Sequence, residues 1–149
     1  MTTANTGRSG RKSADQTTTP AAVAGVSPSC PCGSGSPYRD CCGPLHDGWA
    51  FAPTAVRLMR SRYSAFALGR PQYLLDTWHP STRPPSLELD PQVRWTRLQI
   101  IGTTGGSLLE QRGTVEFRAS YRLGRRTGEQ HENSRFLRVD SRWQYLSAV

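Results

Sequence analysis

Residues 113–123 read GTVEFRASYRL, and apolar and polar side chains alternate along them. In an extended strand, Val115, Phe117, Ala119 and Tyr121 would point to one face and the polar residues between them to the other. Such alternation is typical of an antiparallel sheet that buries one face and leaves the other in water. We therefore expect this segment to be a strand of an antiparallel sheet.

Three further strands are predicted around this segment. Upstream, residues 94–102 are rich in large apolar side chains and are followed by a turn at 103–106. Downstream, a hairpin tip at 124–128 leads into a strand at 129–139, and a fourth strand follows at 143–148. The predicted sheet therefore has four strands.

Two helices are predicted before the sheet. In 54–68, apolar side chains at spacings of three and four form one helix face: Val56, Met59, Tyr63, Phe66 and Ala67. Gly69 ends this helix, and Pro71 can open a second one that closes at His79-Pro80. The prolines within 80–92 favour a loop. Helices packed on one face of a curved four-stranded antiparallel sheet make an α+β fold.

All four cysteines lie within thirteen residues, in the segment CPCGSGSPYRDCC at 30–42. Four thiolates fill every position of a tetrahedral zinc site and leave none for a reacting water. Cys30, Cys32, Cys41 and Cys42 therefore predict a structural zinc knuckle rather than a catalytic metal centre.

Three other interpretations of the cysteines compete with zinc. Two disulfides are disfavoured, because the preceding residues lack the apolar run of a secretory signal and a Cys41–Cys42 bond would be strained. A redox dithiol usually has two residues between its cysteines, and this cluster does not. His46 could replace Cys42 as a ligand and leave one thiol free. We favour zinc on four cysteines.

The cysteine segment also resembles a known motif. Its pattern Cys-Pro-Cys-Gly-Ser-Gly-x-x-Tyr-Arg-x-Cys-Cys is similar to SEC-C, the zinc knuckle at the C-terminal end of the preprotein-translocase motor SecA. In SecA the knuckle contacts a translocation chaperone and the ribosome. The resemblance implies zinc as the cofactor and a protein or ribosome-associated partner for the knuckle.

A second resemblance covers most of the chain. The segments LMRSRYSAF at 58–66, YLxxTWHP at 73–80 and ExSRFL at 132–137 resemble the YchJ family of bacterial proteins. The resemblance implies a SEC-C knuckle at 29–46 and a cone-shaped α+β domain of the nuclear-transport-factor-2-like (cystatin-like) superfamily at 53–149. It implies no activity, because the family has none established.

Two features depart from the pattern of that family. Some relatives carry a second knuckle at the C-terminus, and this chain carries none there. The family also usually begins close to its first cysteine, whereas residues 1–28 precede it here; a start at Val23 or Val26 would account for that difference.

Composition limits the remaining possibilities. Residues 1–28 are rich in small and polar side chains without an aromatic, so we expect them to be disordered. No stretch is apolar enough to span a membrane, and we expect no membrane partner and a cytoplasmic location, where cysteines stay reduced. The formal net charge is +8, but the arginines form no continuous stripe, so most are expected on a solvated surface.

Six residues outside the knuckle are candidates for a pocket in the cone: Arg60, Tyr63, Trp78, His79, Glu132 and Arg135. Arg60 lies close to the apolar face of its helix, where an unpaired charge would be costly. It could form an ion pair with Glu132 or Asp76 that ties the helix to the sheet, and we favour this interpretation. Alternatively, it could line the pocket.

The candidates leave three functions open. We favour a non-catalytic binding module, with a partner on the knuckle and a small ligand or peptide in the pocket. The alternative is a small-molecule enzyme that uses His79, Tyr63, Arg60 and Arg135, but no acid–base pair is visible and His79 more often caps a helix end. RNA contact through the hairpin tip, at Arg122, Arg125 and Arg126, is the weaker alternative.

Overall fold

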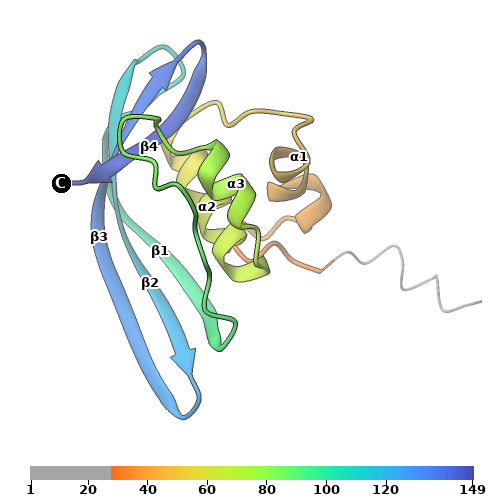
Figure 1. Cartoon of the computed structure of the whole chain (residues 1–149). Coiled ribbons are helices and arrows are strands. Elements are labelled where there is room, and N and C mark those ends of the chain that lie inside the picture. The colour runs from red at the N-terminus through yellow and green to blue at the C-terminus, as the bar shows by residue number, and fades with distance from the viewer. Residues whose placement is uncertain (1–27) are drawn as a thin grey trace, which may run out of the picture.

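The computed structural model describes residues 28–149, so the predicted disordered segment 1–28 lies outside the described residues except for Pro28. Figure 1 shows a curved sheet with the helices on one side of it. In chain order the elements are η2 (Tyr38–Asp40), α1 (Cys42–His46), α2 (Ala55–Leu68), α3 (Pro71–Asp76), β1 (Val93–Gly105), β2 (Arg112–Leu123), β3 (Arg126–Val139) and β4 (Arg142–Ala148).

The four strands form one antiparallel sheet in the order β1-β2-β3-β4, which confirms the predicted α+β fold class. Two predicted turns differ from the structure. β1 continues to Gly105, since Thr104 and Gly105 pair with β2 where a turn at 103–106 was expected. The hairpin tip is shorter than predicted, because Leu123 already pairs with Arg126. Gly124 has a φ of 62°, which a two-residue hairpin turn requires.

The ends of α2 follow from residues that satisfy its free backbone groups. At the start, the Thr54 side chain accepts a hydrogen bond of 3.1 Å from the Arg57 backbone N–H. At the end, Gly69 takes the left-handed conformation with a φ of 69°, and its N–H bonds to the Ala65 carbonyl. These caps fix where α2 begins and ends.

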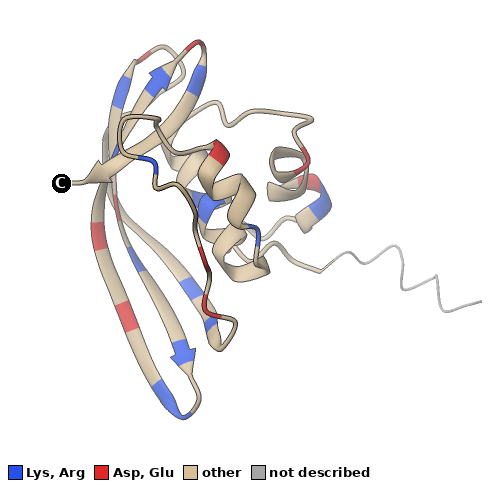
Figure 2. Cartoon of the chain, in the orientation of Figure 1, with Lys and Arg blue, Asp and Glu red and all other residues tan. Residues whose placement is uncertain are grey.

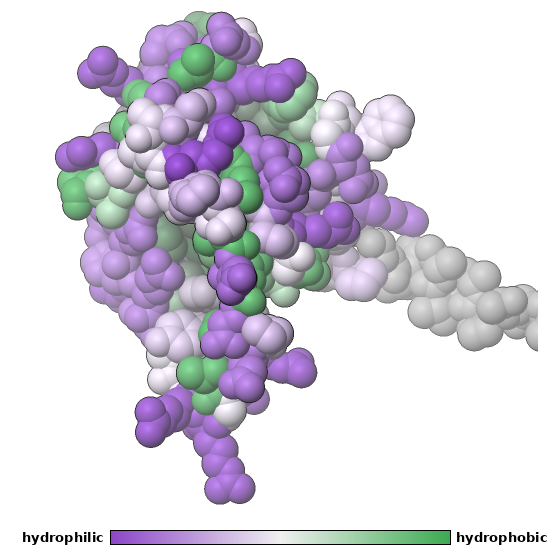
Figure 3. Space-filling model, viewed as in Figure 1, coloured by the Kyte–Doolittle hydropathy of each residue, from purple (hydrophilic) through white to green (hydrophobic). Residues whose placement is uncertain are grey.

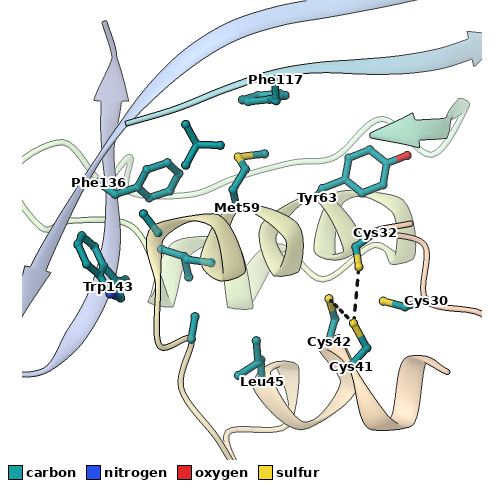
Figure 4. Packing of buried hydrophobic residues seen from close by; sticks show 14 of the residues in the cluster. Cys30, Cys32, Cys41, Cys42, Leu45, Met59, Tyr63, Phe117, Phe136 and Trp143 are labelled. Carbon is teal, nitrogen blue, oxygen red and sulfur yellow. Dashed lines mark hydrogen bonds between the residues drawn. The ribbon is translucent and has the colours of Figure 1, made fainter. Parts of the chain in front are cut away.

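α2 is buried on two sides rather than one. Met59 and Tyr63 point from α2 toward Phe117 on β2, whereas the cysteines lie on the opposite side of the helix (Figure 4). The predicted apolar stripe accounts only for the side toward the sheet. Toward the knuckle α2 also buries small polar side chains, Ser61 and Ser64, beside Leu58, and the two serines let the knuckle approach the helix closely.

The knuckle and the sheet domain share one hydrophobic core. Buried residues from the cysteine segment, α2 and the sheet form a single cluster, which includes all four cysteines, Leu58, Met59, Phe136 and Trp143. The connector at 47–53 is fixed to the sheet where the Trp143 Nε1–H donates to the Pro53 carbonyl at 3.1 Å. The segments 29–46 and 53–149 are therefore separate in sequence but packed together.

Within residues 28–149, no helix has both the length and the apolar composition needed to cross a membrane. The cytoplasmic location stays a prediction. The face shown in Figure 3 is mostly hydrophilic, and apolar side chains are visible there only in small patches.

Candidate metal centre and ligand pocket

The sulfurs of the four cysteines lie close enough to share one metal ion. All four cysteines are buried free thiols, and their sulfurs lie within 4.8 Å of one another. The Sγ atoms of Cys32 and Cys41 are 3.6 Å apart, and those of Cys41 and Cys42 are 4.0 Å apart (Figure 4). A tetrahedron with metal–sulfur bonds of about 2.3 Å has sulfurs about 3.8 Å apart. The set therefore fits a single tetrahedral metal, and no disulfide joins these cysteines.

Tight backbone turns bring the two cysteine pairs together. The Cys30 N–H donates to the Ser36 carbonyl at 2.8 Å, and the Gly33 N–H returns to the Cys30 carbonyl at 3.1 Å. Gly33 has a φ of 79°, a conformation that favours glycine. Cys41 follows the short helix η2 and its N–H bonds to the Tyr38 carbonyl at 3.0 Å, so the second pair faces the first.

Four neighbouring thiols can all ionise only if a cation offsets the charges of the thiolates. A hydrogen bond from the Cys42 thiol lowers the pKa of Cys32, so one thiolate forms readily. The same interaction, together with burial, raises the pKa of Cys42, and burial raises that of Cys41. Further ionisation is therefore unfavourable unless a positive charge sits between the sulfurs.

α2 supplies donors around the sulfurs. Arg57 donates from Nη1 to the Cys42 Sγ at 3.4 Å and from Nη2 to the Cys41 carbonyl at 2.5 Å. The Ser64 hydroxyl donates to the Cys42 Sγ at 3.3 Å and lies 3.5 Å from the Cys30 Sγ. These contacts orient the sulfurs and fix the knuckle to the helix, as supporting hydrogen bonds do around metal ligands.

His46 is a structural residue and not a metal ligand. Its Nε2 lies 2.8 Å from the Ser61 carbonyl, which can only accept, so Nε2 carries the hydrogen. Nδ1 then accepts from the Tyr38 hydroxyl at 2.7 Å. Both ring nitrogens are occupied, and burial lowers the pKa of His46, which favours the neutral ring. The alternative in which His46 replaces Cys42 is therefore wrong.

The structure corrects the prediction for Arg60. Its Nη1 donates to the Cys32 carbonyl at 2.8 Å, so Arg60 faces the knuckle. It does not line the pocket, and among residues 28–149 no carboxylate lies within ion-pair distance of it, so the pairs with Glu132 and Asp76 do not form. The physical reason is that α2 buries two faces, and Arg60 lies on the second.

A cavity of about 220 Å³ lies between α2 and the inner face of the sheet. Half of its lining residues are aromatic, and a few are polar. The residues that line it are Met59, Arg62, Tyr63, Phe66, Trp78, Trp95, Phe117, Ala119, Gln130, Glu132, Ser134 and Tyr145.

Arg62 is the one charged residue of α2 in this pocket, and it is only 4% exposed. Its Nη1 donates to the Leu74 carbonyl at 2.7 Å and to the Thr77 hydroxyl at 2.8 Å. The guanidinium carbon lies 5.3 Å from the ring centre of Trp78 and 4.6 Å from that of Tyr145, within cation–π range. Burial lowers its pKa to about 10, so the side chain stays charged at neutral pH.

Glu132 is the acidic group of the pocket, and three neutral donors hold it. Its Oε1 accepts from the Ser134 hydroxyl at 2.7 Å and from the Tyr145 hydroxyl at 3.1 Å. Its Oε2 accepts from the Gln130 amide at 3.2 Å. Tyr145 thus lies beside both charged groups, with its ring near Arg62 and its hydroxyl on Glu132.

Three of the six predicted pocket residues line the cavity: Tyr63, Trp78 and Glu132. His79 does not, because its Nδ1 accepts from the backbone N–H of Ser81 at 3.1 Å in a local turn. Arg135 does not line it either, since strand side chains alternate and it lies on the opposite face of β3 from Glu132 and Ser134.

Four polar or aromatic residues of the pocket were not predicted from the sequence: Arg62, Gln130, Ser134 and Tyr145. A signal for Arg62 exists, because it lies three residues after Met59 and four before Phe66 on the helix. For β3 the signal is polar side chains at alternate positions, which pair with apolar partners: Glu132 lies opposite Phe117 and Gln130 opposite Ala119. Polar residues on a face that should be apolar indicate a site.

The hairpin tip is basic, as predicted. Figure 2 shows arginines at the free end of the β2–β3 hairpin. Arg122 lies directly opposite Arg94 across the β1–β2 pair, an arrangement of like charges that weakens a sheet. Contact of this tip with RNA stays a prediction.

A cysteine knuckle packed on a nuclear-transport-factor-2-like α+β domain defines the class of this protein. The model of the YchJ middle NTF2-like domain matches residues 54–148, and the chain belongs to the YchJ family. It is 57% identical over 118 residues to a UPF0225 protein of Streptomyces coelicolor. The aligned residues cover 79% of this chain and 92% of that protein. With a UPF0225 protein of Corynebacterium glutamicum the identity is 51% over 116 residues, 78% of this chain and 92% of that one.

Two solved structures share the fold. The solution structure of a SEC-C motif containing protein from Rhodopseudomonas palustris matches with a TM-score of 0.72 and 34% identity, over 82% of this chain and 98% of that one. The crystal structure of a SEC-C motif containing protein from Psychrobacter arcticus matches with a TM-score of 0.66 and 30% identity, over 80% of each chain.

Proposed function

We propose that this chain is a non-catalytic binding protein, in which zinc closes the cysteine knuckle and the aromatic pocket takes a small ligand. Arg62 carries this proposal. A buried cation without a counter-ion is costly, and a folded protein keeps one where a partner compensates it. Among the described residues no carboxylate lies within 4 Å of Arg62. Glu132 acts on Arg62 electrostatically from beyond ion-pair distance, and a ligand in the pocket would supply a partner in direct contact.

The donor set supports zinc in the knuckle. Soft thiolate ligands in tetrahedral arrangement select zinc over hard cations such as magnesium or calcium. Cys30, Cys32, Cys41 and Cys42 would fill all four positions, so the metal would have a structural role. Bound zinc would supply the positive charge that lets all four thiols ionise.

The composition of the pocket supports binding rather than catalysis. Among residues 28–149, no histidine, cysteine or lysine lines the cavity. Burial raises the pKa of both Tyr63 and Tyr145 to about 12, far from the range in which general acids and bases work at neutral pH. Of the four residues predicted for the enzyme alternative, only Tyr63 lines the cavity, whereas Arg60, His79 and Arg135 lie elsewhere.

The test is a screen of small molecules by thermal shift and calorimetry on the zinc-loaded chain. Ala119 is buried on the pocket wall, so Ala119→Leu should fill part of the cavity and abolish binding. Its neighbour Ser120 points to the other face of β2, which makes Ser120→Ala the matched control. The proposal fails if binders are equally affected by both substitutions, or if turnover accompanies binding.

Docking of a protein partner on the knuckle side is a second candidate, and one observation favours it. Trp49 is 86% exposed and Phe51 is 54% exposed in the connector beside the knuckle. Exposed tryptophan is enriched among residues that dominate binding energy at interfaces. Co-sedimentation with purified ribosomes, compared between the wild type, Trp49→Ala and a control at the exposed Leu108, tests the ribosomal partner. Equal recovery of all three would end this candidate.

A further inference from the structure

We propose that the ligand is a small monocarboxylate with a flat apolar body, and that Arg62 binds its carboxylate. This inference rests on the proposed function, since it assumes that the pocket binds a ligand.

The hydrogen bonds of Arg62 leave one edge of the guanidinium free. Both N–H groups of Nη1 are used, by the Leu74 carbonyl and the Thr77 hydroxyl. Among residues 28–149, no acceptor bonds to the Nε–H or to Nη2, although the residue is 4% exposed and lines the cavity. The Nε–Nη2 edge presents two parallel donors, the arrangement that binds a carboxylate through both oxygens.

The rest of the wall selects the body of the ligand. Tyr63, Phe66, Trp95 and Phe117 present rings to the cavity, and such surfaces pack best against a flat apolar group. The cavity of about 220 Å³ is smaller than the roughly 300–1,000 Å³ of pockets for drug-sized molecules. The ligand is therefore compact, with one or two rings or an equivalent unsaturated chain.

Glu132 restricts the charge of the ligand to one. Its carboxylate already lies in the pocket, held by Ser134, Tyr145 and Gln130. A second negative charge on the ligand would be repelled if it came close to this carboxylate. Three donors occupy three of the four lone-pair positions of a carboxylate, so a hydroxyl or amine on the far end of the ligand could donate to the fourth.

The experiment compares probes that share one ring system. Calorimetry measures the binding of 2-naphthoate, 2-naphthamide and naphthalene-2,6-dicarboxylate to the zinc-loaded full chain. We expect the monocarboxylate to bind about 10- to 100-fold more tightly than the amide, because hydrogen bonds to charged groups are the stronger ones. The dicarboxylate should bind no better than the amide.

Substitutions then assign the preference to its residues. Arg62→Gln should make 2-naphthoate and 2-naphthamide bind with equal affinity. Arg62→Lys should keep only part of the preference for the acid, since lysine keeps the charge but lacks the two parallel donors of the guanidinium. Glu132→Gln should admit the dicarboxylate. The last variant leaves Arg62 in place, so it tests the inference even if the Arg62 variants do not fold.

Two results would overturn the inference, and they are distinguishable. If the amide binds as tightly as the acid and Ala119→Leu abolishes both, the pocket binds ligands but Arg62 does not select a carboxylate. If no probe binds at millimolar concentration, and the broader screen finds no small molecule whose binding is lost in the Ala119→Leu variant, the proposed function fails as well.

Discussion

Arg60 and Arg62 lie two positions apart on α2 and meet opposite environments. Arg60 is half-buried, and the Cys32 carbonyl accepts its hydrogen bond on the knuckle side. Arg62 is almost fully buried on the pocket side, with the Nε–Nη2 edge of its guanidinium unused by the described residues. The difference separates an arginine that bonds to the knuckle from one that keeps one edge of its guanidinium available for the proposed ligand.

The largest expected effect comes from removing one cysteine of the knuckle, which packs on one side of α2. Cys42→Ser should abolish metal binding and destabilise the entire fold, because the cysteines belong to the same core as Leu58 and Met59. Structural zinc contributes roughly 10–16 kcal/mol of apparent binding energy in small zinc domains, which is as large as the stability of a typical protein. Metal analysis should give about one zinc per wild-type chain, and circular dichroism should show one cooperative melt.

The control for this prediction is Ser36→Ala, at an exposed position of the same loop. A Cys42→Ser protein that loses zinc but keeps a cooperative melt at the wild-type temperature would contradict the shared core. Iron in place of zinc would contradict the assignment of the metal.

A smaller effect is expected from the arginines themselves. Arg57→Met should cost about 1.5–3 kcal/mol of unfolding free energy, since it removes hydrogen bonds to the Cys42 sulfur and the Cys41 carbonyl. Arg62→Met should cost less, although Arg62 is the more buried, because it also removes a buried charge that has no carboxylate within ion-pair distance among residues 28–149. Urea denaturation measures both values. Should Arg62→Met prove the more damaging, Arg62 would be a structural residue like Arg60.

A pH effect on the knuckle side should come from His46. Burial lowers its pKa in the folded state below the unfolded value of about 6.5, so the unfolded chain takes up the proton more readily. The stability that neutral His46 contributes is therefore present above pH 6.5 and is lost as the pH falls. At pH 5.5 the loss is at most about 1.4 kcal/mol, one pH unit of linkage.

The difference in unfolding free energy between the wild type and His46→Gln, measured at pH 7.5 and at pH 5.5, isolates this contribution. The wild-type advantage should shrink at the lower pH. An unchanged or larger advantage would mean that His46 is protonated in the folded protein, and the hydrogen-bond assignment to Ser61 and Tyr38 would need reversal.

Much of this arrangement could be predicted from the sequence, and α2 shows where prediction stops. Alternation in 113–123 indicates a strand, and the cysteine spacing indicates a metal knuckle. The helix carries a clear apolar stripe toward the sheet. Its other buried face includes Ser61 and Ser64, and serine usually faces water. Periodicity alone therefore cannot show that the knuckle covers this face. For the same reason it does not show which of Arg60 and Arg62 lines the pocket.

The smallest expected effect lies at the hairpin tip, away from both faces of α2. Arg122→Ala removes the like-charge pair with Arg94 and should stabilise the fold by about 0.2–1 kcal/mol. If the tip binds RNA, the same substitution should weaken binding to a single-stranded RNA and reduce the steepness of its salt dependence, because one phosphate contact is lost. Fluorescence anisotropy at several salt concentrations measures the RNA affinity and its salt dependence. Binding that is absent, or equal in the two proteins, would leave Arg94 and Arg122 as a local destabilisation without a role in RNA contact.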